Sequence, residues 1–271
     1  MSQTTPISTS SQSQLPLSCS SNPYSIAEMS ERPIGPIVTV PEATPPSRVT
    51  LTGRTVKLEP LTARHAEQLF PLLNNDHPNQ TALWDYIPDG PFDTLSDLED
   101  DFTKRESSND PLFFAIIDNR PPAGDSKTST AGKPLGYLAY MNISPEHRRL
   151  EIGHVMFSLP LQRTVLATET VYLLLKHALE DLGYRRVEWK CNALNAGSKR
   201  AAARLGFQYE GTFRQHLVVK GRNRDTAWFS ILRDEWEGVK GGFEGWFDEG
   251  NFDERGEQRR KLEDFRKVGS A

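Results

Sequence analysis

The chain has 271 residues, with 36 acidic residues against 32 lysines and arginines and a formal net charge of −4. It has no apolar run approaching the ~18 residues of a membrane-spanning helix, and its mild acidity gives no general attraction to nucleic acid or anionic lipid. The two cysteines, Cys19 and Cys191, are too few for a disulfide framework and have no metal-ligating neighbours at short spacing. We therefore expect no bound metal and a cytoplasmic location, with the nucleus left open.

Hydrophobic residues make up 37% of the chain, and its two ends account for this low value. Residues 1–47 hold eight of the 19 prolines, and the first thirty residues include ten serines. Such a segment buries too little apolar surface to offset chain entropy, so we predict a disordered tail, with a phosphorylated or partner-binding tail as the alternative. Residues 238–271 predict a charged extension that docks through its aromatic residues, with a short helix over 253–268. Residues 48–237 then suit a single domain.

The first half of this domain predicts two helices between strands. Alternating apolar residues indicate a strand over 54–61, and Thr62 and Ser96 are expected to begin the two helices that follow it. Three further apolar stretches predict strands at 112–117, 135–143 and 150–157. The polar turn SPEHRR between the last two indicates an antiparallel hairpin.

The second half predicts the longest helix and three more strands. Apolar residues at spacings of three and four run from Leu161 to Leu182, and Gly183 is expected to end this helix. Asn195 or Ser198 begins another helix. The remaining strands are expected at 186–191, 207–219 and 225–232. This order indicates an α/β (α+β) fold with a mixed, mostly antiparallel twisted sheet flanked by helices, and not a doubly wound nucleotide fold.

The segment SLPLQRTVLATE joins a strand to the long helix and predicts an anion site. Unpaired N–H groups at a helix N-terminus attract phosphate, and Arg163, Thr164 and Thr168 add a positive charge and two hydroxyls. Any strand–helix turn offers part of this, so the segment alone is a weak indication.

A second block, beginning at Asn195 and ending at Phe207, strengthens that indication. Together the two blocks resemble the GCN5-related N-acetyltransferase (GNAT) superfamily, in particular its RimJ/RimL-type branch, over roughly residues 50–233. The matching positions of the family's cofactor loop and second motif are Gln162, Ala167, Thr168 and Glu169, then Asn195, Ser198, Leu205, Gly206 and Phe207.

The resemblance implies that acetyl-CoA is the co-substrate and that an amine attacks its thioester directly. It places the pantetheine against a strand that separates from its neighbour, and the pyrophosphate on the loop. The cofactor-binding residues that it implies are Val155, Met156, Phe157, Gln162, Arg163, Thr164, Val165, Leu166, Ala167, Thr168, Asn195 and Ser198.

Three positions depart from the family pattern. Val165 replaces the first loop glycine, so we expect a loop with negative φ throughout, in which threonine hydroxyls help to hold the phosphates; weakened cofactor binding is the alternative. Ala202 replaces the tyrosine acid of many members, and Leu217 replaces the glutamate base of RimL-like members. A non-catalytic acyl-CoA-binding module is therefore the alternative to an N-acetyltransferase.

Two residues remain as catalytic candidates. Ser198 matches the serine of RimL-like members and is also suited to capping a helix. Glu151 is the best remaining base because it lies on the strand that lines the implied cleft, and a paired carboxylate is its alternative interpretation. His154 has the opposite strand parity, so we expect it on the other face, in the core or at the surface.

The acceptor site is expected in the loop between the first two helices. Trp84, Tyr86 and Phe92 predict an aromatic wall, and Asp85 and Asp89 are placed to attract a cationic amine; a loop that merely closes the core is the alternative. The acceptor itself is a primary amine, on a protein N-terminus or a small molecule. No membrane partner is expected, the scattered basic residues argue against nucleic acid, and a homodimer is left open.

Overall fold

The computed structural model describes residue 1 and residues 34–39, 41–74, 78–122 and 129–266. The chain forms two units, Met1–Val40 and Pro41–Ala271. In the first, residues 34–39 have no helix or strand, and residues 2–33 and 40, Cys19 included, lie outside the described residues. The last part of the predicted tail, residues 41–47, belongs to the second unit, where Ala43 is buried and its N–H donates to Pro145 O at 3.2 Å, so the predicted disorder does not extend to it. No helix in the described ranges is long and apolar enough to cross a membrane.

The described part of Pro41–Ala271 is built on an eight-stranded sheet with the order β1-β2-β3-β4-β5-β6-β8-β7. Neighbouring strands are antiparallel except β5 and β6, which are parallel. The predicted mixed, mostly antiparallel sheet is therefore confirmed. Its strands are β1 Leu51–Thr52, β2 Val56–Pro60, β3 Leu112–Asp118, β4 Pro134–Ser144, β5 Arg149–Phe157, β6 Arg186–Asn192, β7 Gln208–Val219 and β8 Arg222–Leu232.

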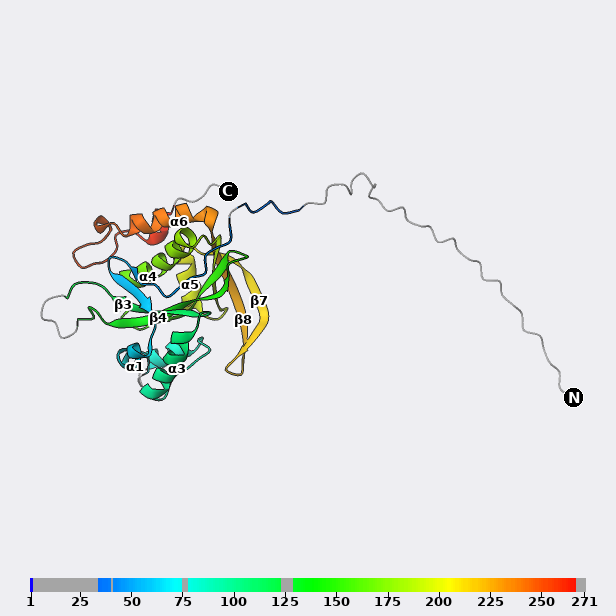
Figure 1. Ribbon diagram of the computed structural model, residues 1–271, viewed down its shortest axis with the longest axis horizontal. Coiled ribbons are helices and arrows are strands. Elements are labelled where there is room, and N and C mark those ends of the chain that lie inside the picture. Colours follow the sequence, from blue (N-terminus) through cyan, green and yellow to red (C-terminus); the bar gives the residue numbers. More distant parts are fainter. Residues whose placement is uncertain (2–33, 40, 75–77, 123–128, 267–271) are drawn as a thin grey trace. The chain divides into compact units, whose positions relative to one another are not determined.

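Helices cover both faces of the sheet (Figure 1). On one face lie α1 (Ala66–Leu73) and α3 (Leu95–Ser107), and on the other α4 (Val165–Lys176), α5 (Ala196–Leu205) and α6 (Arg233–Trp246). The shorter elements are η2 Ala63–His65, α2 Pro78–Thr81, η3 Ala82–Trp84, the π-helical turn η4 His177–Asp181, η5 Glu249–Asn251 and η6 Leu262–Phe265.

The period-two alternation of β4 supplies both cores. Tyr137 and Ala139 pack in the cluster that contains the side chains of α1 and α3. Leu138 and Tyr140 pack in the cluster that contains those of α4, α5 and α6. Both faces of this strand are therefore buried, and polar side chains appear where the strands leave these clusters.

The helix ends follow the local sequence signals with small shifts. The first residue of α3 is Leu95, and its N-cap is Thr94, two residues before the predicted Ser96. Thr94 can cap the helix because its hydroxyl accepts a hydrogen bond from Asp97 N. Gly183 and Gly206 have φ of 79° and 101°, left-handed values that glycine adopts without strain, and they follow the helical segments that they were expected to end.

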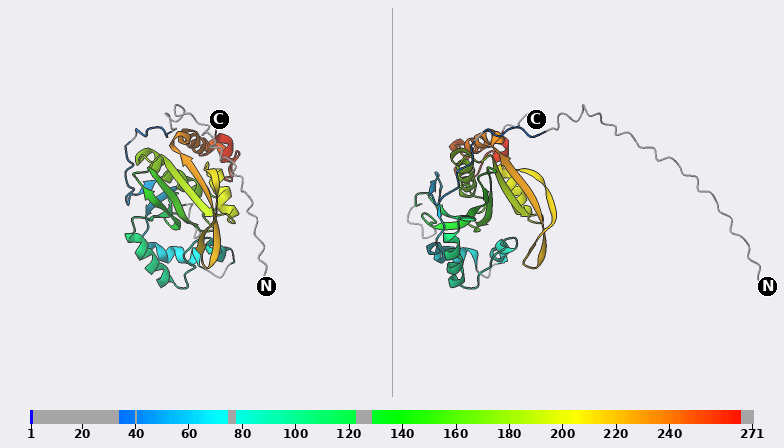
Figure 2. Two further views of the ribbon diagram at one scale, coloured as in Figure 1. Left: turned by 90° about the vertical axis from the view of Figure 1, so that its right-hand side faces the viewer. Right: turned by 45° about the vertical axis from the view of Figure 1, so that its right-hand side comes forward.

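The β7–β8 hairpin lies at the edge of the sheet and reaches toward the α1/α3 side (Figure 2). At its tip, Lys220 Nζ donates a hydrogen bond to Trp84 O at 2.9 Å. This contact ties the last hairpin to the loop in which the acceptor site is expected.

The C-terminal region differs from its prediction. α6 follows β8 directly, and Phe243 and Trp246 are buried, as expected for docking aromatics. The predicted charged helix over 253–268 is wrong for its described part, since only the short η6 forms there and residues 267–268 lie outside the described residues. We call residues 247–266 the C-terminal strap. The division of the chain at 47/48 and 237/238 stays a prediction.

Candidate active site

β5 and β6 separate soon after they meet. They pair only at Arg149↔Arg186, Leu150↔Val187 and Glu151↔Glu188. Beyond this point the edge of β5 that faces β6 carries N–H and C=O groups without a strand partner, which is the arrangement that an extended ligand can complete. A cleft of about 1760 Å³ opens there, with residues 151–157 on one side and residues 189–192 on the other.

A β-bulge redirects the side chains of β5 at this cleft. The register with β4 shifts by one residue between Met156 and Gly153, and His154 has φ of 47°. The His154 ring therefore lies 5.2 Å from the Phe113 ring, in the core on the α1/α3 side. Glu151 lies on that face too, because its Oε1 is 3.5 Å from the position that a Cβ would take if Gly153 carried one. The prediction of opposite faces for Glu151 and His154 is wrong, because the bulge interrupts the alternation on which it rested.

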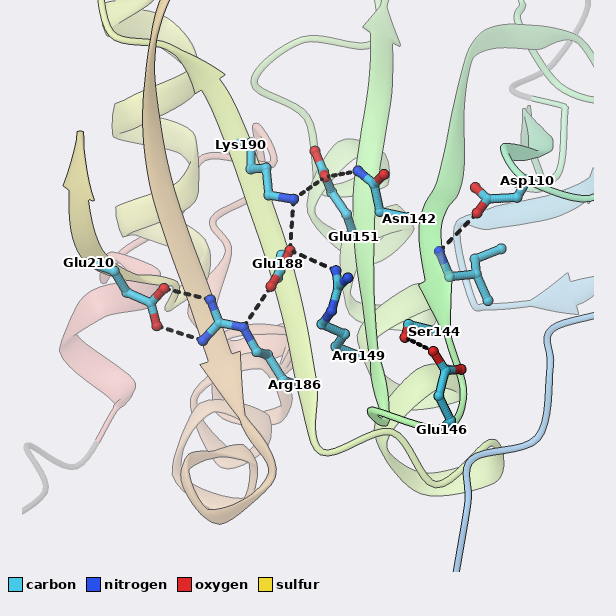
Figure 3. A network of polar contacts seen from close by, with 11 residues as sticks. Asp110, Asn142, Ser144, Glu146, Arg149, Glu151, Arg186, Glu188, Lys190 and Glu210 are labelled. Carbon is cyan, nitrogen blue, oxygen red and sulfur yellow. Dashed lines mark hydrogen bonds and ion pairs between the residues drawn. The ribbon is translucent and has the colours of Figure 1, made fainter. Parts of the chain in front are cut away.

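Glu151 belongs to a charge network at the point where the strands separate (Figure 3). It is 5% exposed, and its Oε2 accepts a hydrogen bond from Asn142 Nδ2 at 2.7 Å and lies 2.8 Å from Lys190 Nζ. Lys190 Nζ is also 2.8 Å from Glu188. Burial raises the pKa of Glu188, but hydrogen bonds from Lys190 and Arg186 outweigh it and hold the pKa below its usual value. Glu151 is thus a paired carboxylate that braces both strands.

The loop between β5 and α4 turns through one left-handed residue. Gln162 N donates to Ser158 O at 3.1 Å, and Arg163 then adopts φ of 62°. This brings Thr164 into an extended conformation as the N-cap of α4, with Val165 as the first helical residue. The expectation of negative φ throughout is therefore wrong. The strained position is Arg163 and not Val165, so a β-branched residue is tolerated where other members have glycine.

The two loop hydroxyls are already engaged within the protein. Thr164 Oγ1 accepts from Ala167 N at 3.2 Å and donates to the carbonyl three residues before it at 2.7 Å. Thr168 Oγ1 donates to Thr164 O at 3.3 Å and accepts from Arg204 Nη1 at 3.0 Å. A hydroxyl has one proton, so neither has one left for a phosphate oxygen, contrary to our expectation. Ala167 N is engaged by the same cap, so the donors that remain are the other N–H groups at the start of α4.

The second block forms the opposite wall at the N-terminus of α5. Asn195 Oδ1 caps the helix by accepting from Ser198 N at 2.9 Å. Ser198 Oγ accepts a hydrogen bond from Trp189 Nε1 at 2.9 Å, and a hydrogen bond from its own hydroxyl partly offsets the burial that raises the pKa of the Cys191 thiol. Ser198 also lines the cleft, and the capping and cleft-facing interpretations of this block hold together.

Only one of the three predicted acceptor-site aromatics reaches the cleft. Trp84 is 1% exposed, and its Nε1 donates to Leu73 O at 2.9 Å. Phe92 packs edge-on against it, with the ring centroids 5.5 Å apart. Tyr86 lines the cleft, and its hydroxyl donates to Leu194 O at 3.4 Å. The predicted aromatic wall is therefore wrong for Trp84 and Phe92, which anchor the loop in the core.

A buried arginine lies beside this end of the cleft. Arg105 is 6% exposed, its Nη2 is 3.1 Å from Asp89 Oδ2, and its guanidinium carbon is 4.8 Å from the Phe113 ring centroid. His154 Nδ1 is 3.7 Å from the same Asp89 oxygen, too far for a hydrogen bond. Burial lowers the pKa of His154, as does the charge of Arg105, while Asp89 opposes them. The imidazole is therefore neutral near pH 7.

The cleft brings the two sequence blocks together, although they lie on different elements. The predicted residues that line it are Glu151, Val155, Met156, Phe157, Gln162, Arg163, Thr164, Val165, Leu166, Ala167, Thr168, Asn195, Ser198 and Tyr86. Sequence reasoning missed His154 as a cleft residue, and also Lys190, Arg204 and the strap. Arg204 directly precedes the Leu-Gly-Phe motif, which is the one local signal that could have indicated it.

Comparison with known proteins identifies the family. A model of the acetyltransferase (GNAT) domain matches residues 55–208. The chain belongs to the GNAT acetyltransferase family. Among solved structures, a GCN5-related N-acetyltransferase from Brucella melitensis is 39% identical, with a TM-score of 0.77, and the match covers 84% of this chain and 98% of that one. The predicted superfamily is thus confirmed.

Two further relatives concern the RimJ/RimL-type branch. A Bacillus subtilis (strain 168) protein named "Putative ribosomal N-acetyltransferase YdaF" is 30% identical over 109 residues, which are 40% of this chain and 59% of that relative. The structure titled Mycobacterium smegmatis RimJ in complex with CoA-disulfide has a TM-score of 0.57 over 69% of this chain and 89% of that one. At 20% identity it shows the shared fold.

GNAT acetyltransferases use acetyl-CoA, and this cleft fits that co-substrate. The unpartnered edge of β5 offers backbone groups to the pantetheine amides, and the N-terminus of α4 offers N–H donors to the pyrophosphate. Arg163 and Arg204 add positive charge beside that helix end.

Proposed function

We propose that this protein is an acetyl-CoA-dependent N-acetyltransferase that transfers acetyl to a primary amine, on a protein N-terminus or a small molecule, by direct attack. The observation that carries the proposal is the separation of β5 from β6 beside the N-terminus of α4. One wall of that cleft can pair with an extended amide chain, and its end can bind an anion. The name of the B. subtilis relative supports including protein N-termini among the acceptors.

When bound, acetyl-CoA supplies a thioester carbonyl that is open to attack by an amine. Residues 155–157 hold the pantetheine amides, and the first turn of α4 with Arg163 holds the pyrophosphate. Ser198 lines the cleft and is oriented by Trp189, so its hydroxyl can stabilise the departing thiolate by a hydrogen bond, while the proton that the thiolate takes up comes from the amine that has attacked.

The attacking amine must first lose a proton, because an alkyl ammonium has a pKa of about 10.4. Glu151 is poorly suited to accept it, since the oxygen that meets Asn142 also meets Lys190. His154 lines the same cleft and has a lowered pKa; its Nδ1 is buried and has no hydrogen-bond partner among the described residues, so Nε2 is the ring nitrogen left to face the cleft. We therefore assign proton acceptance to His154, directly or through a water, and a bracing role to Glu151.

A thiol-release assay tests the proposal. The protein and acetyl-CoA are mixed with a panel of N-terminal peptides and small amines, and the same peptides with a blocked N-terminus serve as the matched control. We expect release above background with at least one free amine and none with its blocked counterpart. Absence of acetyl-CoA binding by isothermal titration calorimetry would overturn the proposal.

A non-catalytic acyl-CoA-binding module is the second candidate. Glu151 is tied to Lys190, and Ala202 and Leu217 stand where other members have an acid and a base. Acetyl-CoA binding without thiol release across the whole panel would favour this function.

A further inference from the structure

The C-terminal strap is a folded part of the unit that contains the cleft. Asn251 is buried, and its Nδ2 donates to Trp246 O at 3.0 Å while its Oδ1 accepts from Arg260 N at 2.9 Å. Leu262 of the strap is fully buried in the core on the α4 side. The strap therefore has a defined position, although it lies outside the residues that the GNAT family model matches.

The end of the strap is fastened to α5. Arg266 Nη1 donates to Arg204 O at 2.7 Å, and Arg266 Nη2 donates to Ala203 O at 3.2 Å. These carbonyls belong to the last turn of α5, where a helix leaves acceptors without partners. Ala203 O already accepts from Gly206 N, so the strap adds a second donor there and a donor to Arg204 O.

The strap also lies beside the anion-binding end of the cleft. Arg204, whose Nη1 donates to Thr168 on the first turn of α4, has its guanidinium carbon 5.0 Å from the Trp246 ring centroid. Trp246 in turn packs edge-on against Phe252 at 5.2 Å and donates from Nε1 to Gln258 Oε1 at 2.8 Å. This chain of contacts runs from the phosphate end of the cleft to the strap (orange to red in Figure 1).

Several strap side chains line the cleft itself: Phe252, Arg255, Glu257, Gln258 and Glu263. Phe252 is half-buried, and Arg255 is exposed. Burial lowers the pKa of Arg204, and the negative charge of Glu263 partly offsets this effect, so Glu263 acts as a counter-charge for Arg204. Arg255 is thus the cation that the strap itself brings to this wall.

We propose that the strap forms a subsite for the 3′-phosphorylated adenosine end of acetyl-CoA, with Phe252 packing on the purine and Arg255 binding the 3′-phosphate. This rests on the proposed function, because the pyrophosphate must lie at the N-terminus of α4 for the nucleotide to reach the strap. A guanidinium is suited to this task, since its fork of N–H donors matches phosphate oxygens.

The test compares CoA with 3′-dephospho-CoA by isothermal titration calorimetry on the full chain. Arg255→Ala removes the proposed contact, and Arg259→Ala removes an exposed strap arginine that does not line the cleft. We expect Arg255→Ala to weaken CoA binding about tenfold, which corresponds to about 1.4 kcal/mol, and to leave the affinity for 3′-dephospho-CoA nearly unchanged. Arg259→Ala should preserve the preference for CoA.

Two other results would count against the subsite. If Arg255→Ala and Arg259→Ala weaken both ligands equally, or if the intact protein binds both ligands with the same affinity, the 3′-phosphate does not meet the strap. Neither result touches the proposed acetyltransferase function. If the intact protein binds no CoA at all, the proposed function fails together with the subsite.

Discussion

At the scale of single residues, one inserted residue in β5 decides which side chains face the cleft. The bulge at His154, with φ of 47°, turns the imidazole to the face that carries Glu151. Arg163 plays a similar role in the next loop, where its left-handed conformation sets Thr164 as the cap of α4. Neither residue is a glycine, so the surrounding hydrogen bonds must hold the conformation that an isolated residue would avoid.

The assignment of His154 predicts a specific pH profile. Because its pKa lies below 6.5, the base is present near neutrality, and kcat/KM should fall as the pH drops through that lowered value. His154→Gln should lower kcat/KM about 100-fold and remove this acid limb. The pH–rate profiles of both proteins check it. Glu151→Gln should retain the limb, and a limb that persists in His154→Gln would exclude this histidine as the base.

The network around Lys190 predicts a large loss of stability on its removal. Lys190→Met leaves Glu151 buried without its cation, while Glu188 keeps Arg186, so the change should cost about 3–5 kcal/mol in the free energy of unfolding. Urea denaturation measures this cost, with the exposed Lys104→Met as a control expected within about 0.5 kcal/mol of the parent.

Because the pKa of Glu188 is lowered in the folded protein, the stability that this network contributes depends on pH. The folded carboxylate stabilises the protein above its unfolded pKa of 4.5, and that contribution is lost as the pH falls through the lower folded value. In Lys190→Met the destabilisation should instead shrink at acid pH, because protonation neutralises the Glu151 carboxylate that has lost its cation. A penalty that does not depend on pH would contradict the assigned pairing.

At the scale of elements, α6 shows how packing overrides intrinsic propensity. The segment GVKGGFEGW is rich in glycine, which weakens a helix by about 1 kcal/mol per residue relative to alanine. Two of these glycines leave room for the strap, since a Cβ on Gly242 would come within 2.5 Å of Arg266 Cγ and one on Gly245 within 2.9 Å of Phe265. The composition that argues against a helix is the composition that lets the strap pack on it.

Adjacent glycines of α6 provide a matched test. Gly241→Ala meets nothing within 4 Å and should raise the free energy of unfolding by about 0.5–1 kcal/mol. Gly242→Ala must displace Arg266, so we expect a net loss of about 1–2 kcal/mol. Urea denaturation of the two variants compares them directly. Equal stabilisation by both would show that the strap does not pack closely on α6.

At the scale of the whole molecule, the region after β8 completes the core. Phe243, Trp246 and Leu262 are buried in the same cluster as the side chains of α4 and α5. Fully burying a large apolar side chain contributes about 1.5–3 kcal/mol. Three such side chains are comparable with the ~5–15 kcal/mol by which a folded domain is stable.

Truncation tests this contribution. A chain that ends at Glu237 should lose cooperative thermal unfolding, because it lacks most of α6 and all of the strap. A chain that ends at Arg266 keeps every residue of the strap and should unfold at the same midpoint as the full chain. Circular dichroism during heating compares the three proteins. A cooperative transition in the shorter chain would show that residues 48–237 fold alone, as the predicted domain boundary requires.

Local chemistry explains what could be predicted from the sequence. Asn195 caps α5 by accepting from Ser198, and the left-handed Gly206 follows that helix, so both signals act within a few residues. The junction from β5 to α4 was recognisable for the same reason, since Thr164 caps Ala167 three residues away. The sequence by itself thus determined the order of the elements, the family and the two blocks that line the cleft.

Tertiary structure decided which side chains face the cleft. The bulge at His154 depends on the register with β4, and Trp84 is buried because Leu73 O accepts its N–H. Arg204 meets Thr168 across 36 residues of chain. Pairing and burial between distant segments leave no fixed spacing in the sequence, whereas caps and turns do. For that reason the capped loop before α4 could be predicted from the sequence, but the position of His154 and of the strap at the cleft could not.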